Sequence, residues 1–255
     1  MPVPVTLPAL SWGSASSSRR ALLVHGLGSH GALMWRFGVA LADAGWHATA
    51  VDLRGHGTAP RCLDYTIAAY AADIGELTGT TGSVDGAPWD LVIGHSLGGA
   101  AATVASAADP GWTRRLVLID PGIRLSDDDR ESVRVGQEQA FADPSEAAVR
   151  AEHPGWHPLD IELKSQAAQQ ASRWAVEQTD VQNEPWDVRE AAARLSVPTH
   201  VIGADPAVYS LFTGALAQEV LRNPAVTMSV IAGAGHSPHR DRPEETIAEL
   251  LRVLA

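Results

Sequence analysis

Short, nearly continuous apolar runs recur along the chain, each four to six residues long and bounded by polar or turn-forming residues. Runs of this length without polar alternation are typical of β-strands that are buried on both faces of a sheet. The sequence therefore predicts strands at residues 21–25, 48–53, 90–94, 116–120, 200–203 and 228–232.

Alanine-rich segments with helical periodicity separate these runs and predict helices at residues 33–44, 66–78, 97–108, 210–222 and 243–254. The last begins with Pro243, Glu244 and Glu245, which favour a helix N-terminus because proline needs no partner there and acids complement the helix dipole. Strands that alternate with helices indicate β–α–β units. We therefore predict an α/β fold with a mostly parallel central sheet and helices on both faces.

Residues 123–195 break this alternation, because they contain helical periodicity but no strand-like run. The segment is too long for an ordinary loop, and we interpret it as a helical lid over the carboxyl edge of the sheet, where open α/β folds bind ligands. Residues 1–122 and 196–255 then form the core, and the lid is an insertion rather than an independent domain. The Gly/Thr/Ser-rich tract 79–88 predicts a surface loop.

Composition excludes some classes of partner. The chain has 255 residues, a formal net charge of −11 and a single cysteine, Cys62. An acidic balance argues against a nucleic-acid partner, and a lone cysteine allows no internal disulfide, which suits a reducing compartment. No secretory signal pattern and no apolar run of membrane-spanning length is evident, so we expect a cytoplasmic protein without a membrane anchor. The sequence leaves the oligomeric state open.

The strongest chemical signal is Gly94-His95-Ser96-Leu97-Gly98-Gly99, which lies between a predicted strand and a predicted helix. This is a G-x-S-x-G pattern in the strand–turn–helix context that a nucleophilic serine requires. The turn exposes the Ser96 hydroxyl at a helix N-terminus, where developing negative charge is stabilised. We predict Ser96 as a catalytic nucleophile.

With these motifs the sequence resembles the α/β-hydrolase family over nearly its whole length. His25-Gly26-Leu27-Gly28 is similar to the family's oxyanion loop, and Asp52-Leu53-Arg54-Gly55-His56-Gly57 to its D-x-R-G-x-G turn. Gly233-Ala234-Gly235-His236-Ser237 is similar to its catalytic-histidine loop. The set most resembles lid-bearing bacterial esterases, with the helical lid inserted after the sixth strand.

A serine hydroxyl needs an adjacent base, and His236 is the candidate because it follows the last predicted strand in a glycine-rich loop. The order Ser…Asp…His of this fold supports that choice. We expect the side chain of His95 to diverge from that of Ser96 at the sharp turn. His25 is expected to brace its loop, and Asp52 its Arg-Gly-His-Gly turn.

Two further histidines are given structural roles. His200 lies within a predicted strand and is expected to be a core side chain with its polar atoms satisfied. His239, beside Arg240 and Asp241, is expected at the surface.

The triad acid has two candidates. Asp205 follows the strand after the lid, which matches the family's usual position, and we favour it. Asp120 ends the preceding strand, where some members of the family carry the acid, so it stays the alternative. The chosen carboxylate would accept the Nδ1–H of His236 and stabilise the imidazolium.

The resemblance also implies an oxyanion hole and a pocket. The backbone N–H groups of Leu27 and Leu97 would hold the oxyanion. The pocket would involve Gly26 and tryptophans that could equally pack the lid against the core: Trp35, Trp156, Trp174 and Trp186.

These features predict hydrolysis of small or medium carboxylic esters through a Ser-His-Asp triad and an acyl-enzyme, with no metal and no cofactor. A lactonase or a C–C bond hydrolase could use the same triad. An alternative of another class is a non-catalytic protein of this fold that binds a small molecule, because function depends on the site rather than the fold.

Overall fold

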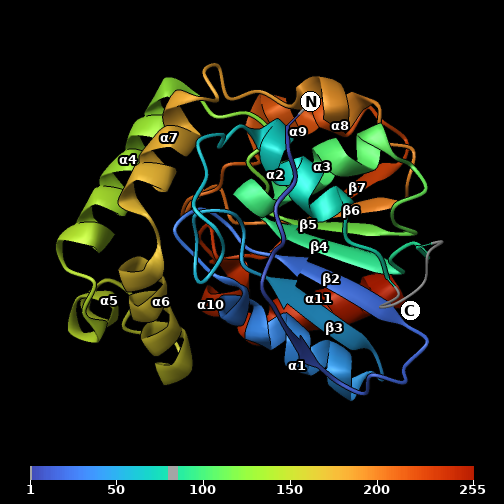
Figure 1. Cartoon of the computed structure of the whole chain (residues 1–255), viewed down its shortest axis with the longest axis horizontal. Helices are drawn as coiled ribbons and strands as arrows, with labels where there is room; N and C mark the ends of the chain where they lie inside the picture. The colour runs from blue at the N-terminus through green and yellow to red at the C-terminus, as the bar shows by residue number, and fades with distance from the viewer. Residues whose placement is uncertain (1, 80–85) are drawn as a thin grey trace.

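A seven-stranded sheet forms the centre of the computed structural model, which describes residues 2–79 and 86–255 (Figure 1). Its order is β1-β3-β2-β4-β5-β6-β7, and all neighbouring pairs are parallel except β1 with β3. The strands are β1 (Ala9–Trp12), β2 (Arg20–Val24), β3 (His47–Val51), β4 (Leu91–His95), β5 (Leu116–Ile119), β6 (Thr199–Gly203) and β7 (Val226–Val230). The predicted α/β class and mostly parallel sheet are confirmed.

Helices cover both faces of the sheet. On one face lie α1 (Trp35–Asp43) and α11 (Pro243–Leu254), and on the other α2 (Ile67–Gly75), α3 (Leu97–Ala108), α8 (Arg189–Ala193) and α9 (Gly214–Val220).

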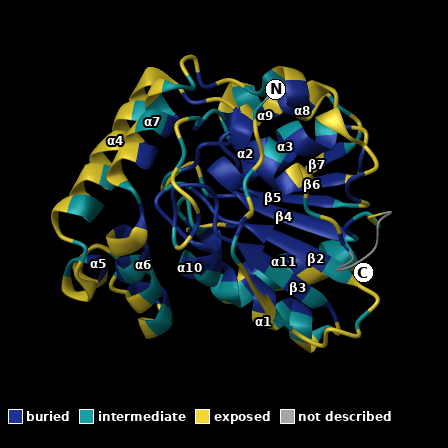
Figure 2. Ribbon diagram, in the orientation of Figure 1, coloured by how far each residue is buried: buried dark blue, intermediate teal, exposed yellow. Residues whose placement is uncertain are grey.

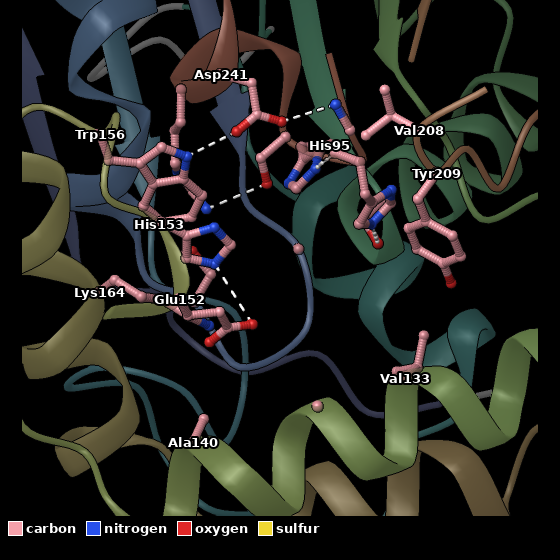
Figure 3. A pocket seen from close by; sticks show the side chains of 18 of the residues that line it. His95, Val133, Ala140, Glu152, His153, Trp156, Lys164, Val208, Tyr209 and Asp241 are labelled. Atoms are coloured by element: carbon pink, nitrogen blue, oxygen red, sulfur yellow. Dashed lines mark hydrogen bonds and ion pairs between the residues drawn. The ribbon is translucent and has the colours of Figure 1, made fainter. Parts of the chain in front are cut away.

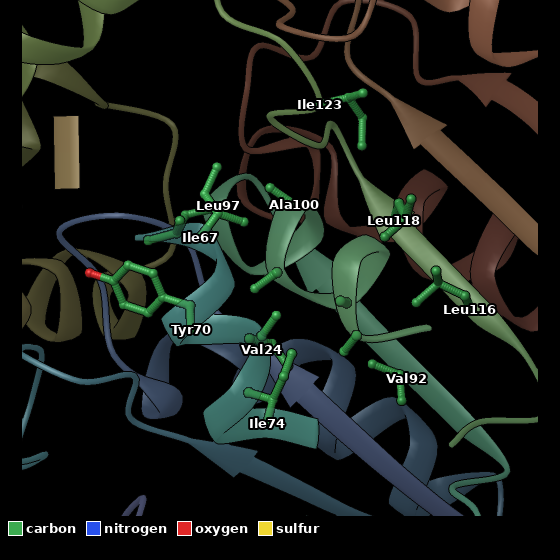
Figure 4. Packing of buried hydrophobic residues seen from close by; sticks show 14 of the residues in the cluster. Val24, Ile67, Tyr70, Ile74, Val92, Leu97, Ala100, Leu116, Leu118 and Ile123 are labelled. Carbon is green, nitrogen blue, oxygen red and sulfur yellow. The ribbon is translucent and has the colours of Figure 1, made fainter. Parts of the chain in front are cut away.

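The two faces have separate apolar cores because successive side chains of a strand point to opposite sides. In β2, Leu22 and Val24 pack towards α2 and α3, whereas Ala21 and Leu23 pack towards α1. Figure 4 shows the first of these cores, in which Val24, Ile74 and Val92 lie together between the strands and α2.

The helical insertion, defined here as α4 to α7, projects from the carboxyl end of the sheet (Figure 1). Its helices are α4 (Asp127–Ala142), α5 (Glu146–Glu152), α6 (Pro158–Gln170) and α7 (Arg173–Val181). No residue of α4 is buried, and Figure 2 shows this helix largely exposed.

The chain enters and leaves this insertion through a narrow neck. The N–H of Leu125 donates to the carbonyl of Trp186 at 3.2 Å, and the N–H of Val188 donates to the carbonyl of Ile123 at 2.8 Å. The two chain segments of the neck therefore form an isolated antiparallel β-bridge at Arg124 and Asp187.

Several predicted details differ from the structure. The insertion follows β5 and not a sixth strand. In the described residues only one strand, β1, precedes β2, so β5 is the fifth strand along the chain. The sequence pattern misses β1, which pairs at the sheet edge and is mostly exposed. Helix α8, inside the predicted lid range, packs on α3 and α9 beside the core. Most of the predicted loop 79–88 lies outside the described residues.

Among the residues that the structure describes, no helix is long and apolar enough to cross a membrane. The remaining short helices are η1 (Gly31–Met34) and α10 (Pro238–Asp241), which flank the carboxyl edge of the sheet.

Candidate active site

Ser96 occupies a strained turn between β4 and α3. Its backbone has φ 53° and ψ −117°, a combination that non-glycine residues rarely adopt. The neighbouring glycines make this turn possible. A Cβ on Gly94 would lie 2.6 Å from the carbonyl oxygen of Gly98, and a Cβ on Gly98 would lie 2.5 Å from the carbonyl oxygens of Val24 and His25. The spacing of the motif therefore reflects close contact between backbones.

Ser96, His236 and Asp120 form a continuous hydrogen-bonded series. The Ser96 Oγ lies 2.9 Å from His236 Nε2, and His236 Nδ1 lies 2.7 Å from Asp120 Oδ2. In the tautomer that fits this geometry, Nδ1–H donates to the carboxylate and Nε2 accepts from the serine hydroxyl. The structure thus brings together the predicted nucleophile and base.

Asp120 is fully buried at the end of β5, in a left-handed conformation with φ 36°. Its carboxylate accepts hydrogen bonds from Ser210 Oγ at 2.6 Å and from the N–H of Leu211 at 3.0 Å, besides that from His236. Burial opposes the charge on this group, but the donors, with His236 foremost, outweigh it and lower the pKa of Asp120. The carboxylate is therefore ionised and oriented.

The expectation that Asp205 is the partner of His236 is wrong for this geometry. Asp205 Oδ1 accepts from the N–H of Ala207 at 2.8 Å, and Oδ2 accepts from the N–H of Gly233 at 2.7 Å. Asp205 stabilises its own turn and fastens the loop that carries His236. The alternative candidate, Asp120, lies at hydrogen-bond distance from His236 Nδ1, because β5 ends next to both Ser96 and His236.

The other histidines have structural environments. His25 is buried, with Nδ1 donating to the carbonyl of Gly26 at 2.7 Å and Nε2 accepting from the N–H of Leu53 at 3.0 Å. It braces its loop as predicted. His95 Nε2 lies 2.9 Å from the carbonyl oxygen of His236, so its side chain contacts the main chain of the histidine loop.

Two further predictions for polar side chains can be compared with the structure. His200 is buried, with ring nitrogens near Thr227 Oγ1 and Ser229 Oγ, in agreement with the prediction. His239, expected at the surface, is fully buried, because α10 turns inward and places its ring against Phe37 and His95.

Asp52 braces its turn as expected. Its Oδ1 accepts from the N–H of Gly31 at 2.8 Å, and its Oδ2 accepts from the N–H of Thr58 at 2.9 Å. The carboxylate thereby ties the D-x-R-G-x-G turn to the start of η1, which follows the oxyanion loop.

Two backbone N–H groups are free near the serine. The N–H groups of Leu27 and Leu97 donate to no acceptor within the described part of the chain. Leu97 is the first residue of α3, where such N–H groups project from the helix end. Gly26 allows its loop to approach, since a Cβ there would lie 3.0 Å from the Cβ of Ser96.

A cavity of about 620 Å³ opens beside Ser96 and His236, within the usual size range of small-molecule sites. Figure 3 shows its walls, with Val133 and Ala140 from the insertion facing Tyr209 and His95 from the core. Gly26 and Trp156 line it as predicted. The sequence reasoning missed Lys164, Tyr209 and Arg240, because none belongs to a local motif.

Besides Trp156, the sequence predicted three tryptophans as pocket residues, and they lie in two kinds of place. Trp186 lines a smaller adjoining cavity of about 210 Å³ and donates from its indole N–H to the carbonyl of Gly122 at 2.6 Å. Trp35 and Trp174 lie outside both cavities, which corrects their prediction as pocket residues. Trp35 is held by Asp160 at 2.7 Å, and Trp174 is 44% exposed beside Tyr65.

In the described part of the chain, no group of three or more His, Cys, Asp or Glu side chains could hold a metal ion. The chemistry that the arrangement itself supports is nucleophilic attack by Ser96 with His236 as base.

The chain is also similar to known hydrolases. It is 34% identical over 150 residues to the lipase LipV of Mycobacterium tuberculosis, a match that covers 57% of this chain and about half, 54%, of the lipase. It is 27% identical over 253 residues to the 2-(acetamidomethylene)succinate hydrolase of Mesorhizobium japonicum, covering 91% of this chain and 87% of that protein. Further curated relatives match over less than half of their length.

A solved structure of E-2-(acetamidomethylene)succinate hydrolase superposes with a TM-score of 0.80 at 22% identity, covering 96% of this chain and 94% of the other. This likeness shows a shared fold. Residues 21–250 match the family model described as the alpha/beta hydrolase family. That match includes the sheet apart from β1, the serine turn, the insertion and the histidine loop, and the chain therefore belongs to the alpha/beta hydrolase family.

Proposed function

We propose that this hydrolase cleaves carboxylic esters of small or medium size through a Ser96–His236–Asp120 triad. The observation that carries the proposal is the unbroken hydrogen-bonded series from Asp120 through His236 to Ser96, which opens into a cavity between core and insertion. The matches to a lipase and to a methyl ester esterase of Neisseria meningitidis, 37% identical over 111 residues, give further support.

In the first half-reaction, Ser96 Oγ attacks the ester carbonyl while His236 Nε2 takes the hydroxyl proton. The N–H groups of Leu27 and Leu97 stabilise the negative charge that develops on the carbonyl oxygen. The tetrahedral intermediate then collapses, the bond to the alcohol oxygen breaks, and His236 gives its proton to the departing alcohol. The product of this half-reaction is an acyl-enzyme on Ser96.

In the second half-reaction, His236 takes a proton from water, and the resulting hydroxide attacks the acyl carbonyl. Collapse of the second intermediate breaks the bond to Ser96 and returns the proton to its oxygen. Asp120 stays ionised throughout and stabilises the imidazolium that forms in each half-reaction.

The test combines active-site labelling with a substrate panel. A fluorophosphonate probe should label the wild-type protein and fail to label Ser96→Ala, and p-nitrophenyl esters should be hydrolysed only by the former. Equal labelling of both proteins would overturn the serine mechanism. Lactones and C–C substrates in the same panel separate the alternatives, because turnover of these alone would replace the ester assignment.

A further inference from the structure

An arginine is buried in the wall of the cavity without an ionic partner. Arg240 on α10 is only 4% exposed, and its Nη1 donates to Ser237 Oγ at 3.3 Å. Its Nε and Nη2 find no acceptor among the described residues. The guanidinium also lies 5.2 Å from the ring centre of Trp156. Arg240 thus contacts the residue that follows His236 in the histidine loop.

The nearby carboxylates are engaged elsewhere. Asp160 is fully buried and binds both Arg36, at 2.7 Å, and the indole of Trp35. Asp241 accepts from the Trp156 indole at 2.7 Å and from the N–H of Gly235 at 2.8 Å, as Figure 3 shows for Trp156. Within the described residues neither forms an ion pair with Arg240, but Asp241 also lines the cavity, and both carboxylates favour the charged guanidinium at longer range. Burial outweighs them and lowers the pKa of Arg240 to about 10, so the group stays protonated at neutral pH.

A second cation lines the same cavity from the insertion. Lys164 on α6 donates from Nζ to the carbonyl of Gly28 at 3.2 Å and forms no ion pair with a described residue. Burial, helped by the charge of Arg240, lowers its pKa to about 8, so the amine is largely protonated at neutral pH.

One acidic side chain on the insertion also lines the cavity. The Glu152 carboxylate lies 3.6 Å from His153 Nε2 and is 65% exposed, so water screens its charge. It therefore weakens the field of buried Arg240 and half-buried Lys164 only at the rim.

We propose that Arg240 and Lys164 form a subsite for a carboxylate, so that the substrate is an ester that carries a free carboxylate group. A buried guanidinium without an ion pair is costly unless an anion comes close to its charge, and a carboxylate bound in the cavity that Arg240 lines would be such an anion. The two cations run against the overall charge of the chain, which is −11. This inference rests on the proposed ester hydrolysis and names its substrate class.

The kinetic test compares substrates that differ only in charge. Monomethyl succinate, glutarate and adipate place the carboxylate on the acyl side, and acetoxyacetate places it on the alcohol side. Their primary amides are the neutral controls. We expect the ratio of kcat/KM for acid over amide to fall about 10- to 100-fold in Arg240→Gln, the range for lost charged hydrogen bonds. Lys164→Gln should lower it in the same direction.

Arg222→Gln is the matched control, because Arg222 is exposed and lies after α9, outside the cavity. It should leave the ratio of acid to amide at the wild-type value. If the wild-type protein shows no preference for any acid over its amide, or if Arg240→Gln and Lys164→Gln both keep the full preference, the proposal is overturned.

A binding test separates this proposal from the catalytic one. In Ser96→Ala, glutarate should raise the melting temperature and glutaramide should not, and Arg240→Met should abolish the glutarate shift while the protein without ligand keeps or gains stability. A glutarate shift in a protein that hydrolyses no ester would retain the carboxylate subsite and reject the esterase. Ester turnover with no glutarate shift and no preference for acid over amide would retain the esterase and reject the carboxylate subsite.

Discussion

The carboxylate of Asp120 accepts a hydrogen bond from His236 Nδ1 at 2.7 Å, whereas Asp205 accepts only from backbone N–H groups. Asp120→Asn should therefore lower kcat on the order of 10⁴-fold, because an amide cannot stabilise the imidazolium. Asp205→Asn should change kcat far less and should lower stability only slightly, through weakened loop hydrogen bonds. Steady-state kinetics with an ester, and urea unfolding of both variants, decide between the two carboxylates. A larger kcat loss in Asp205→Asn would contradict the triad proposed here.

The close contact of Gly98 with β2 gives a second prediction. A Cβ at this position would lie 2.5 Å from two backbone oxygens, so Gly98→Ala should move the serine turn or the oxyanion loop and abolish most activity. Gly136 on α4 is a matched helical glycine with no atom within 4 Å of an added Cβ. Gly136→Ala should stabilise the protein by about 0.5–1 kcal/mol and leave the fold intact. Thermal unfolding of both variants provides the comparison, and ester turnover is read from Gly98→Ala against the wild-type protein, because Gly136 lines the cavity.

Buried histidines predict acid sensitivity. Burial lowers the pKa of His56 to about 4 and that of its neighbour His25 to about 3. As the pH falls below about 6.5 the unfolded chain takes up these protons first, so stability decreases with falling pH down to the folded values. From pH 7 to pH 4, His56 alone should cost about 3 kcal/mol.

This dependence is measured as the urea midpoint at pH values from 4 to 7. His56→Leu should flatten part of the slope, and Val181→Leu, an exposed substitution that changes no titratable group, is a control that should keep it. An unchanged slope in His56→Leu would show that this group does not drive acid unfolding.

A buried ion pair joins the turn after β3 to α2. Arg54 is 1% exposed and contacts both carboxylate oxygens of Asp73 at 2.6 Å. Arg54→Met should destabilise the protein by about 3–5 kcal/mol, because the Asp73 carboxylate is left buried and unpaired. Adding Asp73→Leu should recover part of that loss. Chemical unfolding of the single and double variants measures the coupling, and additive effects would argue against it.

Ser96 and His236 could be predicted because each lies in a local pattern, a glycine-rich turn directly after an apolar run. The acid could not be chosen in the same way. Asp120 and Asp205 both follow strands, and the choice depends on the chain near residue 210 folding back to donate from Ser210 and Leu211 to Asp120. Such long-range contacts have no signature in either segment alone.

The residues of the cavity wall could not be predicted from local patterns either. Arg240 precedes an acidic residue and therefore resembles a surface position in the sequence. Its burial arises from the insertion, where Trp156, 85 residues away from Asp241, bonds to that carboxylate and covers α10. Conversely, α3 and α11 begin and end at the predicted residues, because clear start signals and continuous periodicity mark both helices.

The narrow neck between Ile123 and Val188 has a consequence for how this protein could change. Since both ends of the insertion meet there through paired backbone hydrogen bonds, the chain enters and leaves the segment at one place. A change in its length therefore leaves the register of β5 against β6 untouched, whereas a change in its side chains must keep the contacts that Asp160 and Trp156 make with the core. Asp120 and the serine turn remain on the core side of that junction, so the part of the cavity wall that the insertion supplies can change while the bond-breaking groups stay in place.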